Sequence, residues 1–177
     1  MQTLESIAKR KSTRDFDPDK AVSNETIDMI VKAGCQAPIG ANKRESLHLT
    51  VCRSKAILEE INQSTATAMQ TEARDFFYSA PVVVFVSASQ EQMAPGIEYA
   101  NAACVIENML IAATDAGIDN IYLWGAVQGL AKNKALCDKL GIPNGFRPVS
   151  AAAIGYSRSG SPKARELSVS LETNYVE

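Results

Sequence analysis

The feature that most constrains the fold is a long apolar helix predicted between residues 98 and 116. Apolar side chains recur there at helical spacing, and Gly117 follows as a residue suited to end a helix. The apolar positions are Ala102, Val105, Ile106, Met109, Leu110 and Ala113. Such a broad apolar surface needs cover on more than one side. The pattern therefore predicts a helix in the middle of the fold or in an interface between two copies of the chain.

Shorter patterns on either side of this helix predict a mixture of helices and strands. Helical spacing and capping residues mark helices at 3–11, 23–34, 54–61 with a polar extension to about 78, and 132–140. Alternating or continuous β-branched runs mark strands at 47–52, 81–86 and 149–154, with a short apolar segment at 121–125. No repeat or linker divides the chain. The 177 residues therefore predict a single domain, 1–177, that mixes helix and strand.

The charge balance and the cysteines limit the class of protein. With 18 basic and 20 acidic residues, the net charge of −2 predicts neither a nucleic-acid partner nor a membrane partner. No apolar run has the length of a membrane span or the form of a signal peptide. The four cysteines lie far apart in apolar or helical contexts, which favours reduced, buried thiols: Cys35, Cys52, Cys104 and Cys137. We therefore expect a cytoplasmic protein.

Several kinds of catalytic chemistry lack residues to support them. His48 is the only histidine and lies on the polar phase of a predicted strand, so a histidine-based zinc site is not expected. No serine or cysteine has a motif for nucleophilic catalysis, and the glycines form neither a dinucleotide fingerprint nor a P-loop. The sequence predicts no metal ligand and no catalytic side chain.

Two short segments concentrate positive charge. The first contains Arg10, Lys11, Ser12 and Arg14, which could hold a phosphate through guanidinium, ammonium and hydroxyl donors. Basic residues at the end of a helix also complement the helix dipole. A purely structural role at the helix end therefore remains an open alternative to phosphate binding. In the second segment, Lys163 and Arg165 alternate along an extended chain and share one side, although a solvated tail explains them equally well.

In the order of its features the chain resembles the nitroreductase family of flavoproteins. Residues 7–16 resemble that family's N-terminal signature, a helix followed by Arg-x-Ser-x-Arg/Lys-x-Phe. Residues 37–42 resemble its Ala-Pro-Ser-x-x-Asn loop, residues 98–118 its central helix, and residues 140–156 its C-terminal half. The resemblance implies an α+β, nitroreductase-like fold with a central mixed sheet flanked by helices. It also implies an intertwined homodimer with two flavin mononucleotide (FMN) sites at the interface.

The resemblance assigns cofactor-binding roles to three groups of residues. Arg10, Lys11, Ser12 and Arg14 would hold the ribityl phosphate and the pyrimidine edge of one FMN, and Lys163 and Arg165 would complete the phosphate site. Pro38, Ile39, Gly40 and Asn42 would come from the other chain and cover the ring system. Leu123, Trp124 and Gly125 would lie beside the redox edge. Local cations suit a phosphate and a reduced flavin that both carry negative charge.

Two positions depart from the family pattern. Ile39 stands where the family usually has Ser, which removes a hydroxyl beside the cofactor, and Arg44 stands where Gln is common. We predict that Arg44 adds a cation near the substrate mouth and favours an acidic or electron-rich partner, a surface arginine being the alternative. The chain is also short for the family, without an evident insertion to cover the pocket.

Three hypotheses for the function remain open. The leading one is a ping-pong reductase in which NADH or NADPH reduces flavin N5 and a small electron-poor acceptor, nitroaromatic or quinone-like, then takes the electrons. Here the cofactor, and no side chain, carries the chemistry. The second is specialised flavin chemistry on the same fold, such as dehalogenation, heterocycle oxidation or flavin breakdown. The third is a non-catalytic FMN-binding protein, and a dimeric domain without flavin is a further alternative, because fold does not fix function.

Overall fold

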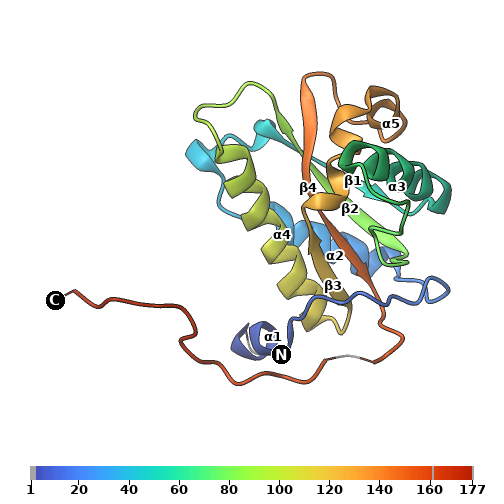
Figure 1. The fold of residues 1–177 in the computed structure, drawn as a ribbon. Coiled ribbons are helices and arrows are strands. Elements are labelled where there is room, and N and C mark those ends of the chain that lie inside the picture. The colour runs from blue at the N-terminus through green and yellow to red at the C-terminus, as the bar shows by residue number, and fades with distance from the viewer. Residues whose placement is uncertain (1–2, 161, 177) are drawn as a thin grey trace.

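A four-stranded antiparallel sheet, with helices on both faces, organises the molecule (Figure 1). The computed structural model describes residues 3–160 and 162–176. The strands are β1 (Leu47–Cys52), β2 (Val82–Ser89), β3 (Asp119–Leu123) and β4 (Phe146–Gly155), and they lie in the order β1-β2-β4-β3. Their pairings β1 with β2, β2 with β4, and β3 with β4 are all antiparallel.

Five α-helices surround this sheet within the described residues. They are α1 (Thr3–Lys9), α2 (Asn24–Cys35), α3 (Lys55–Met69), α4 (Ile97–Asp115) and α5 (Lys134–Lys139). Short 3-10 turns occupy Gly40–Asn42, Arg44–Ser46, Gly125–Val127 and Leu130–Lys132. Side chains cap two of the helices as their sequences predict, because the Ser23 hydroxyl accepts from Thr26 N–H and the Ser54 hydroxyl accepts from Ile57 N–H.

The sheet separates two apolar cores. Alternate residues of β2 point to opposite faces, so Val84 packs with α2 and α4 while Phe85 packs with α3 and α5. Residues 82–88 of β2 are all buried, which confirms the prediction of a strand covered on both faces. Helix α4 packs closely on α2, where a Cβ at Gly34 would lie 2.7 Å from the Met109 side chain.

Helix α4 is buried on one side and exposed on the other. Met109 and its neighbours on the buried side fill the core, which confirms the prediction of a helix in the middle of the fold. The opposite side carries small exposed residues, among them Ala100, Ala103 and Cys104. No helix within the described residues is both long and apolar enough to cross a membrane.

The structure corrects three details of the sequence predictions. The α+β class is confirmed, but the sheet is antiparallel rather than mixed, and parallel pairing is seen at an isolated bridge between Ser12 and Asn120. Residues 70–81 account for this, because after α3 they run back along that helix, so that β2 enters the sheet antiparallel to β1. Helix α3 ends at Met69 rather than near residue 78. Cys52 is buried as expected, whereas Cys35 and Cys104 are exposed because they lie on helix surfaces that face outward in the single chain.

Candidate functional site

The cationic segment after α1 runs beside strand β3. Thr13 N–H donates to the Asn120 carbonyl at 3.0 Å, and Ser12 pairs with the same residue in parallel. This backbone pairing fixes residues 10–14 along the edge of the sheet. Lys11 lines a small cavity of about 170 Å3 at the C-terminal end of α4, and the structure therefore places its side chain apart from the cavity that Arg14 lines.

The C-terminal tail returns to this segment. Arg165 N–H donates to the Ala8 carbonyl at 3.0 Å, and Arg165 Nη2 donates to the Arg10 carbonyl at 3.1 Å. Arg10 Nε lies 3.9 Å from Glu107 Oε1, whose side chain is half exposed, and a pair of this kind contributes little stability. Lys163 is exposed two residues earlier in the tail. The structure thus brings together the two cationic segments that the sequence separates.

A cavity of about 190 Å3 joins Arg14 to the segment after β3. Leu123 is buried in its wall, whereas Trp124 is 58% exposed and Gly125 follows at the start of a 3-10 turn. The remaining lining residues are Met69, Arg74, Phe76, Tyr78, Ile121, Tyr122 and Ala126. Arg14 and residues 123–125, assigned to one end of the cofactor, therefore meet at one cavity.

A turn held by Asp75 contributes Arg74, Phe76 and Tyr78 to the wall of this cavity. The Asp75 carboxylate accepts hydrogen bonds from Phe77 N–H at 2.9 Å, Ser79 N–H at 2.5 Å and Asn62 Nδ2 at 3.2 Å. Tyr78 and Ser79 adopt left-handed backbone conformations, with φ of 57° and 63°. Such conformations cost about 1–3 kcal/mol each for non-glycine residues, so the hydrogen bonds of Asp75 offset local strain.

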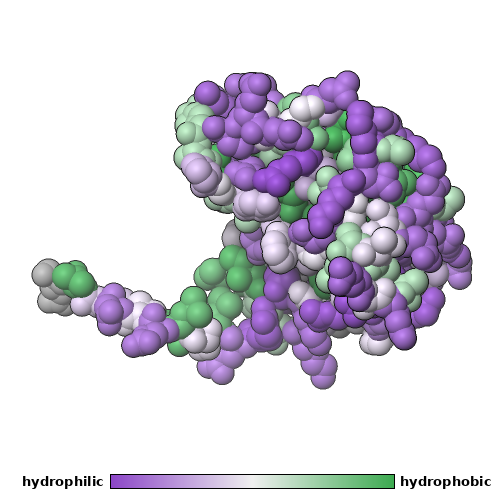
Figure 2. Space-filling view, turned by 45° about the horizontal axis from the view of Figure 1, so that its top comes forward, coloured by the Kyte–Doolittle hydropathy of each residue, from purple (hydrophilic) through white to green (hydrophobic). Residues whose placement is uncertain are grey.

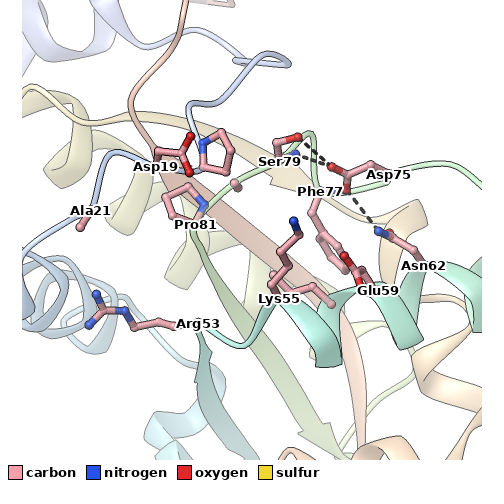
Figure 3. Close-up of a pocket in the computed structure, with 13 residues that line it drawn as sticks. Asp19, Ala21, Arg53, Lys55, Glu59, Asn62, Asp75, Phe77, Ser79 and Pro81 are labelled. Atoms are coloured by element: carbon pink, nitrogen blue, oxygen red, sulfur yellow. Dashed lines mark hydrogen bonds between the residues drawn. The ribbon is translucent and has the colours of Figure 1, made fainter.

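The same turn borders a second cavity of about 400 Å3 on its other side (Figure 3). Leu58 and Phe77 supply an apolar floor, and the rim carries charges of both signs, including Asp19, Lys55 and Glu59. None of the residues assigned from the sequence lies there. Its mixed rim does not select one class of ligand.

The loop at residues 38–42 lies elsewhere on the chain. Gly40 N–H donates to Asn101 Oδ1 at 3.0 Å, and a Cβ at Gly40 would lie 2.5 Å from Ile97 Cδ1. Both contacts are on the first turns of α4, whereas Arg10 faces Glu107, about 9 Å further along the helix axis. Pro38 and Asn42 are exposed. Gly40 lines a separate cavity of about 270 Å3 with Asn101. A single chain therefore does not gather the loop and the cations around one cavity.

The two residues that depart from the expected pattern have contacts of their own. Arg44 Nη1 donates to the Cys35 carbonyl at 2.5 Å, at the C-terminal end of α2, where a cation complements the helix dipole. Ile39 is half-buried and packs against the core between the sheet and α2 and α4. These contacts give Arg44 a structural role, and its effect on acceptor preference stays a prediction.

Asp15 anchors the start of the tail beside Arg14. Its carboxylate accepts from Ser157 Oγ at 2.8 Å, from Ser159 N–H at 3.1 Å and from the Ser159 hydroxyl. The hydroxyls of Ser159 and Ser157 are the main reason that the pKa of Asp15 lies below its ordinary value. The tail therefore leaves the sheet from a defined point near the cationic segment.

Sequence reasoning missed Arg74, Asp75 and Tyr78. All three lie in the stretch that was expected to continue α3, where polar residues give no sign of a cavity. Gln70 ends the helix in a left-handed conformation instead, with φ of 53°. The one local signal was Asp75 itself, because aspartate side chains often accept a hydrogen bond from the backbone two residues further on, but this does not specify what the turn faces.

Comparison with known proteins adds a family match and related structures. The model of the Nitroreductase family matches residues 7–156. A protein of Archaeoglobus fulgidus, provisionally named NADH dehydrogenase/NAD(P)H nitroreductase, is 28% identical over 158 residues, which cover 89% of this chain and 86% of the relative.

Two solved structures resemble the whole chain. A nitroreductase with bound FMN from Bacteroides fragilis has a TM-score of 0.82 and 27% identity, with 100% of both chains covered. A nitroreductase with bound FMN from Desulfitobacterium hafniense has a TM-score of 0.86 and 24% identity, again with 100% of both chains covered, and at this identity it supports the fold.

Proposed function

This chain belongs to the nitroreductase family, and from that premise we propose that it is an FMN-dependent oxidoreductase that takes electrons from NADH or NADPH. The FMN-bound structure from Bacteroides fragilis supports the cofactor, and the name of the Archaeoglobus relative supports the reductant. The proposed acceptor is a small electron-poor molecule, such as a nitroaromatic or a quinone, reduced in a ping-pong sequence.

The observation that carries the proposal is the contact between Arg165 and the segment after α1. Arg10 and Arg165 come from opposite ends of the chain, and the tail brings the second guanidinium to the backbone of the first. Ser12 lies two residues after Arg10 and Lys163 two residues before Arg165, so these segments also carry a hydroxyl and an ammonium. Planar guanidinium donors and a hydroxyl suit a phosphate dianion. The residues present therefore fit the phosphate end of FMN.

The cavity beside β3 fits the redox end. When bound, FMN supplies the two-electron chemistry, which for a nitro compound converts nitro group, NAD(P)H and a proton into nitroso group, NAD(P)+ and water. Arg14 places a positive charge in this cavity. Once a bound cofactor and a partner chain exclude water from this cavity, the Arg14 cation would stabilise the negative charge of a reduced flavin more than it does in solution. Trp124 offers an exposed ring surface at the same place.

We also propose that a second copy of the chain completes the site. The cavity of about 190 Å3 is smaller than the roughly 300–1000 Å3 of typical small-molecule sites. The loop of residues 38–42 contacts a different part of α4, so it can cover the cofactor only from a partner chain. The exposed small residues of α4, Ala100, Ala103 and Cys104, allow close approach of another helix.

The C-terminal tail supports the same dimer. After Arg165 the tail leaves the body of the molecule (Figure 1), and Figure 2 shows apolar residues along it. Leu167, Val169 and Leu171 are 52%, 74% and 80% exposed, and they alternate with polar residues as in a strand with one buried face. Nothing in the described part of the same chain covers them. A partner chain would bury this face, because exposed apolar patches usually mark interaction sites.

The experiment that tests the cofactor and the reductant is an absorption spectrum of the purified protein, followed by anaerobic addition of NADH and then NADPH. A yellow flavin spectrum that bleaches with either reductant supports the proposal. A protein that stays colourless after incubation with FMN removes the cofactor and the proposed function together. A flavin that bleaches without turnover of nitroaromatics or quinones favours specialised chemistry on the same fold.

The dimer is tested separately by light scattering and flavin content. We expect two chains and two FMN molecules per particle. Deletion of residues 167–177 should weaken dimerisation, because it removes the apolar face that a partner chain would bury. It should also weaken FMN binding, because the deleted segment continues directly from the part of the tail that holds Arg165 at the cationic segment. A monomer that binds FMN as tightly as the full chain would contradict the shared site.

A further inference from the structure

The cavity that joins Arg14 to Trp124 holds an excess of positive charge. Arg14 and Arg74 both line it. The ion pairs found among residues 3–160 and 162–176 involve neither of them. If the cofactor occupies Arg14, as proposed above, the charge of Arg74 remains uncompensated. A cation in that position is able to bind a further anionic group.

Contacts within the chain hold Arg74 in place. Its guanidinium carbon lies 4.7 Å from the centre of the Phe76 ring, and that ring is buried. A guanidinium stacked on an aromatic face is held flat, which leaves its donor edge free for a planar partner. Asn62 Oδ1 accepts from Phe76 N–H at 3.0 Å and so fixes the backbone that carries this ring.

Tyr78 lines the same cavity in a strained backbone conformation. Its φ of 57° is unfavourable for a bulky aromatic residue. Hydrogen bonds on either side keep it there. Asp75 accepts from the backbone N–H groups of Phe77 and Ser79, and the Tyr78 carbonyl accepts from Phe16 N–H at 3.1 Å. The second contact ties the turn to the segment that carries Arg14. Strained residues held by surrounding contacts often lie at functional sites.

We propose that Arg74 and Tyr78 select the acceptor, favouring planar aromatic molecules that carry a carboxylate or a similar acidic group. This inference rests on the proposed function and names the substrate class of the same site. The Arg74 fork can bind a carboxylate with two parallel hydrogen bonds, and the Tyr78 hydroxyl can donate a third. The exposed ring of Trp124 offers a surface for stacking of an aromatic acceptor. Arg74, and not Arg44, then supplies the cation that favours acidic acceptors, because Arg44 donates to the Cys35 carbonyl.

The test compares two acceptors that differ in one charge, 4-nitrobenzoate and its methyl ester. The holoenzyme reduces each with NADH, and the quantity measured is the ratio of kcat/KM for the acid to that for the ester. We expect Arg74→Gln to lower this ratio about tenfold, the size of one or two charge-assisted hydrogen bonds. The loss should lie in KM for the acid, with the ester little changed. Tyr78→Phe should lower the ratio less, because it removes one neutral donor and keeps the ring.

Two matched variants remove a cation elsewhere. Arg158→Gln removes one exposed arginine outside the cavity, and Arg44→Gln removes the cation of the earlier prediction. Both should leave the ratio unchanged. A ratio that falls equally in Arg158→Gln would show a general effect of net charge, and a fall confined to Arg44→Gln would move the selectivity to that residue. Either outcome overturns the proposal.

Flavin binding separates failure of this inference from failure of the proposed function. FMN affinity and the rate of anaerobic reduction by NADH should be the same in Arg74→Gln as in the unaltered protein. If instead both fall while the acid-to-ester ratio holds, Arg74 serves the cofactor and the inference is wrong although the function stands. If the unaltered protein takes up no FMN, the proposed function itself fails before any acceptor is added.

Discussion

Gln70 illustrates how a single residue can lower the stability of a helix end. It closes α3 with φ of 53°, a conformation that glycine adopts without steric cost. The side chain is exposed, so it contributes little packing. We predict that Gln70→Gly raises the free energy of unfolding by about 0.5–1 kcal/mol, measured by urea denaturation.

Gln63 provides the matched control for that substitution. It is equally exposed but lies inside α3, where backbone conformation is already helical. Gln63→Gly should therefore lower the free energy of unfolding by about 0.5–1 kcal/mol, because glycine loses more backbone entropy in a helix. Changes of the same sign in both variants would show that the left-handed conformation of Gln70 carries no cost.

Single residues of the candidate site were predictable to different degrees. Arg10 and Arg165 stood out because cations gather in short segments, and resemblance to a family joined the two segments. Arg74 did not stand out, because it lies alone in a polar stretch with ordinary neighbours. What places it at the cavity is a hydrogen-bonded turn and a buried ring, and both depend on contacts with α3. Sequence patterns do not indicate contacts of this kind.

Between elements, Gly129 has the closest contact with a neighbouring backbone among the glycines of the described residues, and that backbone belongs to α3. A Cβ at Gly129 would lie 2.2 Å from the Thr65 backbone nitrogen, and backbone cannot move aside as a flexible side chain can. We predict that Gly129→Ala lowers the free energy of unfolding by about 1–3 kcal/mol, the usual cost of overpacking. Gly125→Ala should be near neutral, because open space surrounds that position. Equal melting temperatures for the two variants would contradict this account.

The attachment of the tail should depend on pH through Asp15. Since the pKa of Asp15 in the folded chain lies below its ordinary value of 3.8, its hydrogen bonds stabilise the folded state fully above that value. The contribution is lost as pH falls through the lowered pKa. We predict that Asp15→Asn lowers the melting temperature at about pH 6 and that its difference from the unaltered protein shrinks towards about pH 3. A difference that stays constant over this range would mean that the carboxylate charge has no part in the attachment.

Elements marked by capping residues or by strand alternation were predicted correctly. The segment after Met69 was not, because its conformation depends on contacts with residues distant in the sequence. Ser23 and Ser54 cap the helices that they precede, and Gly117 follows α4 with φ of 73°. Strand β1 has the predicted bounds. The stretch after Met69 was taken for helix, because its polar residues permit a helix and its true conformation depends on hydrogen bonds between Asp75 and α3. The direction of the strands likewise depends on this stretch.

For the whole molecule, the reactivity of two thiols tests the proposed dimer. Cys35 and Cys104 are exposed in the single chain, whereas burial raises the pKa of the Cys52 and Cys137 thiols and slows their reaction. If a second chain covers the exposed side of α4, Cys104 should react with maleimide at least about tenfold more slowly than in the urea-unfolded chain.

Mass spectrometry of the labelled peptides gives the rate for each cysteine. Cys35 should keep a rate close to that of the unfolded chain, and dilution that separates the subunits should bring Cys104 to the same rate. A Cys104 that reacts freely in particles shown to be dimers would place the interface on another face of the molecule.

The length of α4 limits where the protein can tolerate inserted residues. The helix holds the loop of residues 38–42 at Asn101, the cationic segment at Glu107 and helix α1 at Asp115, so its turns set the spacing between the loop and the cationic segment. One inserted residue would lengthen the helix by about 1.5 Å and rotate everything beyond it by about 100°. Added residues in the 90–96 connection would disturb neither. Lineages of this protein should therefore vary in the length of that connection while the number of residues in α4 between Asn101 and Asp115 stays constant.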